Sequence, residues 1–169
     1  YILCSNEEGL VIVDQHAAQE RYHYEQLNEK LLVQCTNKQP LMVPIQLDVS
    51  SNVLVQYMAI NEKTAFFGIE FEPFGTDQLI LREIPLWFHD VDQKQFLQDL
   101  LDYFVENQDV DMAKLRKHMI ATMACHSSIR FNRPLSMQEM KQVILDLQKC
   151  KQPYHCPHGR PTVIVMSDN

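Results

Sequence analysis

The junction between a short apolar run and a polar segment near the start of the chain constrains the fold most. The run at residues 10–13 is Leu-Val-Ile-Val, and it follows a polar turn at residues 5–9. Such a run is typical of the second strand of a hairpin that begins at residues 1–3. From Gln15 to about Leu32, apolar and small residues recur at helical spacing with no Pro or Gly between them. The sequence therefore predicts a strand that ends at Asp14 and leads directly into a helix.

Three potential metal ligands lie at this junction. His16 and Glu20 are four residues apart on the predicted helix, so their side chains project from one face, and Asp14 lies just before the first turn. Plainer roles also suit these residues, since a His and a Glu at this spacing form surface hydrogen bonds and an Asp at a helix start is typically a cap. The segment in isolation leaves both interpretations open.

Two distant segments add further donors. Cys125 and His126 lie in the segment 124–130, and Cys156 and His158 lie in the segment 156–161. Pro157 and Pro161 are expected to hold the second segment extended, so that residues two apart point the same way. Thiolate, imidazole and carboxylate groups together suit zinc or a similar divalent ion.

Three motifs resemble one family. The first is D-Q-H-A, two residues, E, four residues, E, which spans residues 14–25 and ends at Glu25. The second, A-C, three residues, I-R, spans 124–130, and the third, C-P-H-G-R-P, spans 156–161. With these motifs the chain resembles, from about residue 1 to its end, the C-terminal domain of MutL-type DNA mismatch-repair proteins, in the branch with a latent metal-dependent endonuclease.

The resemblance implies a nicking hydrolase that cuts one phosphodiester strand of duplex DNA. It implies the catalytic residues Asp14, His16 and Glu20, and a metal site made of Asp14, His16, Glu20, Cys125, Cys156 and His158. Zinc favours the Cys and His ligands, whereas manganese favours the carboxylates.

Three further charged residues of these motifs are expected to act beside the ligands. Glu25 lies about 140° around the helix from Glu20, so we expect it to support a ligand or to pair with Arg21 rather than to bind the same ion. Arg130 and Arg160 are expected to contact phosphate or to pair with a motif carboxylate, and the sequence leaves both roles open.

A further family element is a short motif for docking onto the replication sliding clamp. It matches Gln39, Leu41, Met42 and Pro44. The alternative is that residues 41–47 form an ordinary strand whose side chains are core. Docking requires Gln39 and at least one of Leu41 and Met42 to be accessible, whereas the alternative requires both apolar side chains to be buried.

Charge argues against autonomous DNA binding. The formal net charge is −7, which is the wrong sign for a protein that approaches polyphosphate alone. The resemblance implies that other proteins or regions bring the domain to DNA. These are an N-terminal ATPase region joined by a long linker, the sliding clamp, and a MutS-type mismatch recognition protein that acts through the full-length protein. ATP would act only through the N-terminal region. Tethering of this kind replaces intrinsic affinity with effective concentration.

Composition is that of a globular chain, with 46% hydrophobic and 22% charged residues. Five cysteines, an odd number, do not indicate a disulfide framework. The sequence contains no apolar run of membrane-spanning length and no signal segment at its start, so we expect a cytoplasmic protein without a membrane partner.

The positions of the motifs predict an α+β fold with two subdomains. Residues 1–38 and 122–169 would form a discontinuous metal-bearing subdomain, and residues 39–121 an inserted one. The resemblance implies that the first is a homodimerisation subdomain and that the insert is a regulatory, or external, subdomain. The expected elements of the insert are a strand at 41–47, a helix at 51–67 with Met58 among its inward residues, a hairpin of 71–74 and 78–84, and helices at 94–106 and 112–125.

The chain then returns to the first subdomain. Ser136 and Glu139 form a capping box for a helix that runs to about Lys149. Residues 162–166 are apolar on both faces, which predicts a strand covered on both sides. If this strand pairs antiparallel with residues 10–13, the loop 155–161 lies beside Asp14.

Two other classes of function remain open. In a non-catalytic dimerisation module, a purely structural zinc would require a saturated site of four ligands. A zinc deaminase or a thiol enzyme would also use Cys and His, but the deaminase signature is absent and neither Cys125 nor Cys156 has an evident base beside it.

Overall fold

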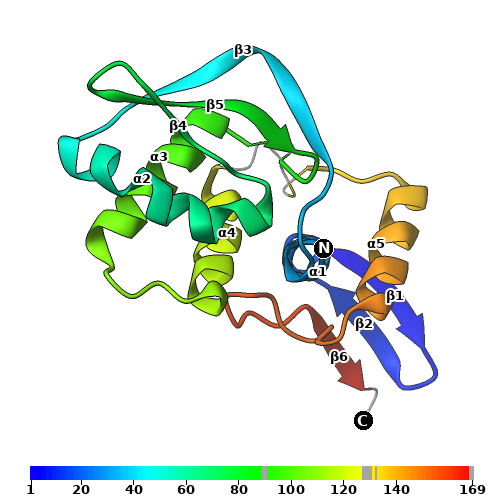
Figure 1. Cartoon of the computed structure of the whole chain (residues 1–169). Helices are drawn as coiled ribbons and strands as arrows, with labels where there is room; N and C mark the ends of the chain where they lie inside the picture. Colours follow the sequence, from blue (N-terminus) through cyan, green and yellow to red (C-terminus); the bar gives the residue numbers. More distant parts are fainter. Residues whose placement is uncertain (89–90, 127–130, 132, 168–169) are drawn as a thin grey trace. The chain divides into compact units, whose positions relative to one another are not determined.

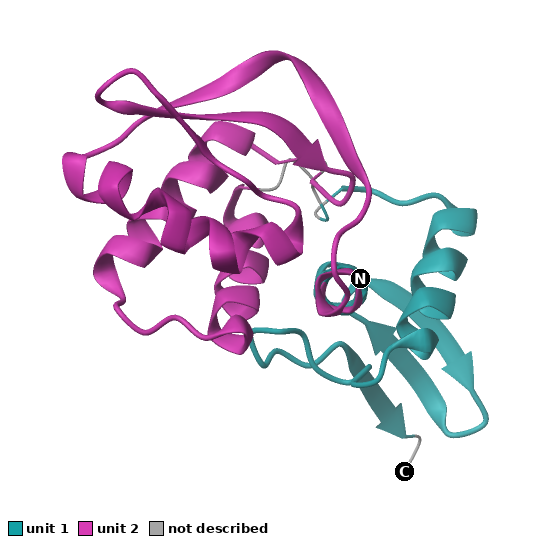
Figure 2. Ribbon diagram, viewed as in Figure 1, with its two compact units in different colours: residues 1–27, 129–169 teal, residues 28–128 magenta. Residues whose placement is uncertain are grey.

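The computed structural model describes residues 1–88, 91–126, 131 and 133–167, and it confirms the α+β class (Figure 1). The chain divides into two compact units (Figure 2). Unit 1 comprises residues 1–27 and 129–169, and unit 2 comprises residues 28–128. The first unit is thus assembled from both ends of the sequence. The assignment of dimerisation and regulatory roles to such subdomains stays a prediction.

Unit 1 contains a three-stranded antiparallel sheet in the order β1-β2-β6. Its strands are β1 (Ile2–Asn6), β2 (Gly9–Val13) and β6 (Val163–Ser167), with Val13 opposite both Ile2 and Val163. The predicted hairpin and the predicted antiparallel pairing of the last strand are therefore confirmed. Because Asp14 follows β2 and Thr162 precedes β6, the two residues meet, and the Asp14 amide donates to the Thr162 carbonyl at 2.8 Å.

Two helices complete unit 1. Helix α1 (Gln15–Leu32) begins directly after β2 and continues into unit 2, and α5 (Met137–Lys149) begins at Ser136. The predicted capping box is confirmed, since the Glu139 amide donates to the Ser136 hydroxyl at 3.2 Å and the Ser136 amide donates to the Glu139 carboxylate at 2.7 Å. The apolar side of α5 packs on one face of the sheet in a core that contains Ile2, Val13, Ala18, Val143, Leu147 and Cys150.

The opposite face of this sheet is apolar and exposed. The β-sheet register places Leu3 beside Ile12 and Ile164, and Leu10 beside Met166. Of these side chains, Ile12 is partly buried and the other four are exposed. The prediction that residues 162–166 are covered on both sides is therefore wrong for a single chain, because α5 covers one face of the sheet and the side chains on the other face remain accessible.

Unit 2 contains a second antiparallel sheet in the order β3-β5-β4. Its strands are β3 (Lys38–Asp48), β4 (Glu72–Phe74) and β5 (Gln78–Pro85), and its helices are α2 (Ser51–Thr64), α3 (Gln93–Glu106) and α4 (Met112–His126). All of these elements were predicted within a few residues. The end of the predicted helix 51–67 differs, because residues 65–67 tighten into a 3₁₀ turn (η1, Ala65–Phe67) that ends at Gly68.

Helices α3 and α4 supply much of the core of unit 2. Their fully buried side chains include Phe96, Leu97, Leu100, Leu101, Leu115 and Met119. In contrast, the prediction that Met58 faces inward is wrong: its side chain is 67% exposed, because α2 turns Val53, Ile60 and Thr64 toward the core instead. None of the helices in the described part of the chain combines the length and apolarity that crossing a membrane requires.

Candidate metal centre

Three potential ligands converge in unit 1. The donor atoms of Glu20, Cys156 and His158 all lie within 4.8 Å of one another. Glu20 comes from the second turn of α1, whereas Cys156 and His158 come from the loop before β6. The group brings one oxygen, one sulfur and one nitrogen donor to one place, and this mixture suits zinc.

A tight turn presents the two loop ligands. The Cys156 amide donates to the Arg160 carbonyl at 2.8 Å, and the Gly159 amide donates to the Cys156 carbonyl at 2.9 Å. Gly159 has φ +85°, a left-handed conformation that a residue with a Cβ rarely adopts. The expectation that prolines hold this segment extended is wrong, because Pro157, with its φ fixed by the ring, favours an early position in a turn.

Glu20 is the electrostatic centre of the cluster. Its Oε1 lies 2.8 Å from His16 Nε2, and its Oε2 lies 3.5 Å from His158 Nδ1 and 3.6 Å from Arg160 Nη2. The Glu20 side chain is 18% exposed, so these contacts are partly shielded from water. A hydrogen bond with the Cys156 sulfur and the charge of Glu20 raise the pKa of Arg160. Arg160 thus pairs with a motif carboxylate, and its contact with phosphate stays a prediction.

Two buried atoms of the site favour a bound cation. Within the described residues, neither His16 Nδ1 nor Glu20 Oε2 has a hydrogen-bond partner, although both atoms are inaccessible to water. Burying such an atom without a hydrogen bond is costly, and the His158 and Arg160 nitrogens at 3.5 and 3.6 Å from Glu20 Oε2 do not supply one. A divalent ion held by Glu20, Cys156 and His158 would satisfy the carboxylate oxygen, so the residues present fit the expected metal.

The other predicted ligands lie outside this group of three. Asp14 caps α1, since its Oδ1 accepts from the Ala17 amide at 3.1 Å. His16 contacts Glu20, and its ring meets the edge of Phe131 at a centroid distance of 6.0 Å. Cys125 is an exposed residue near the end of α4 in unit 2, and Arg130 lies outside the described residues. The metal roles of Asp14, His16 and Cys125, and the phosphate role of Arg130, stay predictions.

Arg21 was expected only as a partner of Glu25. The structure contains this pair, with Arg21 Nη1 3.8 Å from Glu25 Oε1. Both side chains also bind the backbone of the loop that leads to Cys156. The spacing of four residues on a helix predicts the ion pair, whereas no local pattern predicts a backbone partner more than a hundred residues away.

The predicted docking segment lies on the surface of unit 2. Strand β3 pairs with β5 on both sides of a bulge, with Pro40 opposite Glu83 and Ile45 opposite Leu81, so that residues 41–44 leave the regular ladder. Gln39 is exposed, Leu41 is half-buried, and Met42 is fully exposed at 102%. The alternative that residues 41–47 are wholly core is therefore wrong.

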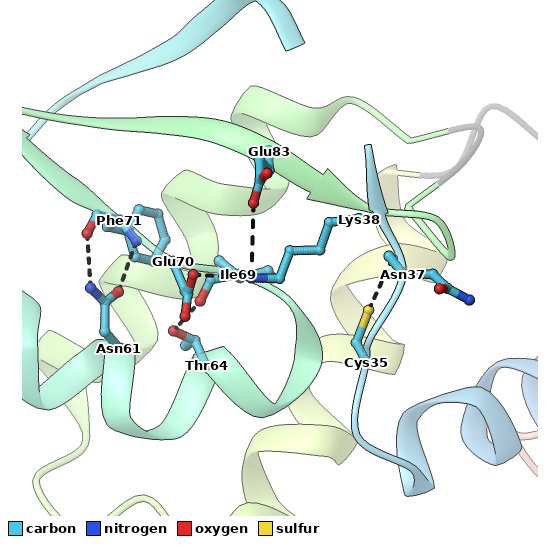
Figure 3. Close-up of polar contacts among 9 residues, drawn as sticks. All are labelled: Cys35, Asn37, Lys38, Asn61, Thr64, Ile69, Glu70, Phe71 and Glu83. Carbon is cyan, nitrogen blue, oxygen red and sulfur yellow. Dashed lines mark hydrogen bonds and ion pairs between the residues drawn. The ribbon is translucent and has the colours of Figure 1, made fainter. Parts of the chain in front are cut away.

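Residues 41–44 border a cavity that is lined mainly by polar side chains. The cavity, of about 540 Å³, is lined by Leu41, Met42 and Pro44 of the predicted docking segment together with Glu70, Glu72 and Arg82. At the near end of the segment, the Lys38 ammonium lies 3.0 Å from Glu70 and 4.0 Å from Glu83 (Figure 3). The segment is thus fixed at its base while its apolar side chains remain accessible.

The fold and the cluster define an α+β domain with a preformed site of mixed oxygen, nitrogen and sulfur donors. Comparison with known proteins gives the family: residues 1–135 match the model of the MutL C terminal dimerisation domain. The DNA mismatch repair protein MutL of Shouchella clausii is 35% identical over 167 residues, and that of Anoxybacillus flavithermus is 38% identical over 167 residues. Both alignments cover 99% of this chain, but 26% and 28% of the respective relatives.

The chain therefore belongs to the MutL C-terminal dimerisation domain family. It spans about a quarter of the length of these relatives.

Proposed function

We propose that this chain is the part of a MutL mismatch-repair protein that nicks one strand of duplex DNA with a divalent metal. The observation that carries the proposal is the convergence of Glu20, Cys156 and His158 beside buried His16 Nδ1 and Glu20 Oε2 atoms that lack hydrogen-bond partners in the described residues. Three ligands converge within the described residues, which would leave one position of a tetrahedral ion open, as is typical of catalytic zinc rather than structural zinc. This count favours the nuclease over a purely structural zinc site.

The residues would divide the work as follows. Glu20, Cys156 and His158 hold the ion, which when bound would polarise a phosphate oxygen and activate water. Glu20 also orients His16 through their 2.8 Å contact. Arg160 adds positive charge beside the cluster, where a DNA phosphate would approach. Asp14 begins the helix that carries Glu20, and it contributes a second carboxylate near the start of α1.

Substitution of the carboxylates tests the nuclease. Asp14→Asn and Glu20→Gln preserve shape but remove a charged oxygen, so nicking of supercoiled DNA by the full-length protein with manganese should fall by orders of magnitude. Glu7→Gln, which makes the same charge change in the exposed turn between β1 and β2, is the control. Nicking at the wild-type rate in both site variants would exclude their assigned roles.

We further propose that the exposed sheet face of unit 1 binds a second copy of the chain. Leu3, Leu10, Ile164 and Met166 make this face apolar, and apolar surfaces of this kind are typical of homodimer interfaces. The family description as a dimerisation domain supports the same occupant. Ile164→Lys should give a monomer in sedimentation equilibrium, whereas Val55→Lys on the exposed side of α2 should not. A dimer that survives Ile164→Lys would exclude this face.

Delivery to DNA is the third part of the proposal. A net charge of −7 predicts weak binding to DNA by the chain alone. Docking of Gln39, Leu41, Met42 and Pro44 to a sliding clamp would raise the local concentration of the nuclease, and the exposure of Gln39 and Met42 supports this. ATP and a MutS-type partner would act through the N-terminal region of the full-length protein.

Clamp docking has its own test. Nicking of primed circular DNA with loaded clamp should be stimulated in the wild type and lose that stimulation in a Gln39→Ala, Met42→Ala double variant. The control is a Val55→Ala, Met58→Ala double variant, which truncates exposed apolar side chains on α2. Equal stimulation of the wild type and the motif variant would exclude docking while leaving the nuclease assignment intact.

A further inference from the structure

The loop that carries Cys156 and His158 is bound to α1 by two charged side chains. Both oxygens of Glu25 accept backbone hydrogen bonds, one from the Lys151 amide at 2.7 Å and one from the Gln152 amide at 3.0 Å. Arg21 Nε donates to the His155 carbonyl at 2.6 Å. Together these bonds hold the loop from just after α5 to the residue before Cys156.

The two side chains form a shielded unit. The Arg21 and Glu25 side chains are 9% and 13% exposed, and their charges lie 3.8 Å apart. The Arg21 guanidinium also lies 5.5 Å from the centre of the Tyr24 ring. Hydrogen bonds from a charged group to the backbone are stronger than neutral ones, and little water competes for them at this exposure.

The placement of this pair links it to the metal cluster. Arg21 follows Glu20 directly in α1, so one rigid helical turn carries both the ligand carboxylate and the anchor of the loop. Cys156 follows His155, whose carbonyl Arg21 holds. A displacement of the loop base from Arg21 and Glu25 would therefore move the sulfur and imidazole donors away from the Glu20 oxygen.

The far end of the loop has a separate anchor. Thr162 is fully buried, and its amide donates to the Tyr154 carbonyl at 2.9 Å. This bond closes the loop on itself but joins it to β6 rather than to α1. The Thr162 carbonyl accepts from the Asp14 amide at 2.8 Å, so this end is held at the start of α1, whereas the bonds made by Arg21 and Glu25 attach the base of the loop to the body of α1.

We infer that Arg21 and Glu25 are positioning residues that hold the Cys156 and His158 loop in a metal-binding conformation before the metal arrives. The inference rests on the proposed metal site. Glu25 is not among the three donors that converge, and both of its oxygens accept from the backbone of the loop. The pair acts through the loop, whose correct position brings three donors within reach of one ion.

Glu25→Gln tests this role. The substitution replaces one acceptor oxygen with an NH₂ group that faces a backbone N–H donor, so at least one of the two loop bonds is lost. Titration of the metal-free chain with zinc alone, against a competing chelator, should show an affinity about 10- to 100-fold weaker than in the wild type. In the zinc-free state, the Lys151 and Gln152 amides should exchange with deuterium faster than in the wild type.

Two controls separate positioning from general stability. Glu7→Gln makes the same charge change in the exposed β1–β2 turn and should leave zinc affinity unchanged. Val143→Ala weakens the α5 core of unit 1 without removing a loop bond, so it should lower stability while retaining zinc affinity.

The outcomes are distinct. Wild-type zinc affinity in Glu25→Gln would overturn the inference and leave the proposed metal site standing. An equal loss of zinc affinity in Val143→Ala would also overturn it, because the pair would then act through stability alone. Failure of the wild type itself to bind zinc would overturn both the metal site and the positioning role.

Discussion

Strand β3 carries both a buried core residue and the exposed segment that is predicted to dock, so substitutions in the two parts should differ sharply in their effect on stability. Leu47 is completely buried, so Leu47→Ala should lower the free energy of unfolding of unit 2 by about 2–5 kcal/mol. Met42 is 102% exposed, so Met42→Ala should change it by less than about 0.5 kcal/mol. With a urea dependence of about 2 kcal/mol per molar, Leu47→Ala should lower the urea midpoint by roughly 1–2.5 M. Met42→Ala should change it by less than about 0.25 M.

The chain contains its own probe for this measurement. Trp87 is the single tryptophan, it lies in unit 2, and its indole N–H donates to the Phe67 carbonyl at 2.9 Å. Its fluorescence during urea unfolding therefore reports on the unit that contains β3, even if unit 1 unfolds separately. A loss of stability in Met42→Ala as large as in Leu47→Ala would show that Met42 is packed, and would refute the surface placement of the docking segment.

Three further outcomes follow from local chemistry. A hydrogen bond from Arg133 lowers the pKa of the exposed Glu139 to about 2, from a usual 4.5, so the carboxylate stabilises the fold above about pH 4.5 and loses this effect as the pH falls through about 2. In urea unfolding of Glu139→Gln at several pH values, this loss of stability in acid should be missing. The same pH profile in the variant and the wild type would contradict the prediction. Gly68→Ala should cost more than about 1 kcal/mol in urea unfolding, because φ is +85° and the new Cβ would lie 2.8 Å from the Cys35 sulfur; a neutral effect would contradict this conformation. Burial raises the pKa of Cys150 to about 11, so mass spectrometry of the native chain after brief iodoacetamide treatment should find this thiol unmodified, and its ready alkylation would mean that it is accessible.

Elements with local sequence signals were predictable almost to the residue. Helix α1 was predicted over residues 15–32 because an Asp precedes a long run without Pro or Gly, and α5 was predicted from the box of Ser136 and Glu139. The inward face of α2 was less predictable. Apolar residues lie on several sides of this helix, so the sequence did not single out the stripe of Val53, Ile60 and Thr64 over Met58.

The sequence predicted which residues belong to the candidate site better than it predicted how the backbone holds them together. The pairing of β2 with β6 was expected, and with it the approach of the last loop to the start of α1. The turn at Cys156 was not expected, because it depends on backbone hydrogen bonds to Arg160 and on the left-handed conformation of Gly159. The attachment of the loop to Arg21 and Glu25 was also beyond local reasoning, since it joins segments that only the folded chain brings together.

The register of β2 and β6 links the core of unit 1 to the candidate metal site. Val13 lies opposite Val163, and this pairing sets the next bond, from the Asp14 amide to the Thr162 carbonyl. A slip of one residue would move the loop by about 3.3 Å and exchange the two faces of β6, which would turn Val163 away from α5. The packing of Val163 against the α5 core therefore opposes the slip. The register of β2 and β6 therefore contributes, together with the bonds of Arg21 and Glu25, to the position of the Cys156 turn relative to Glu20.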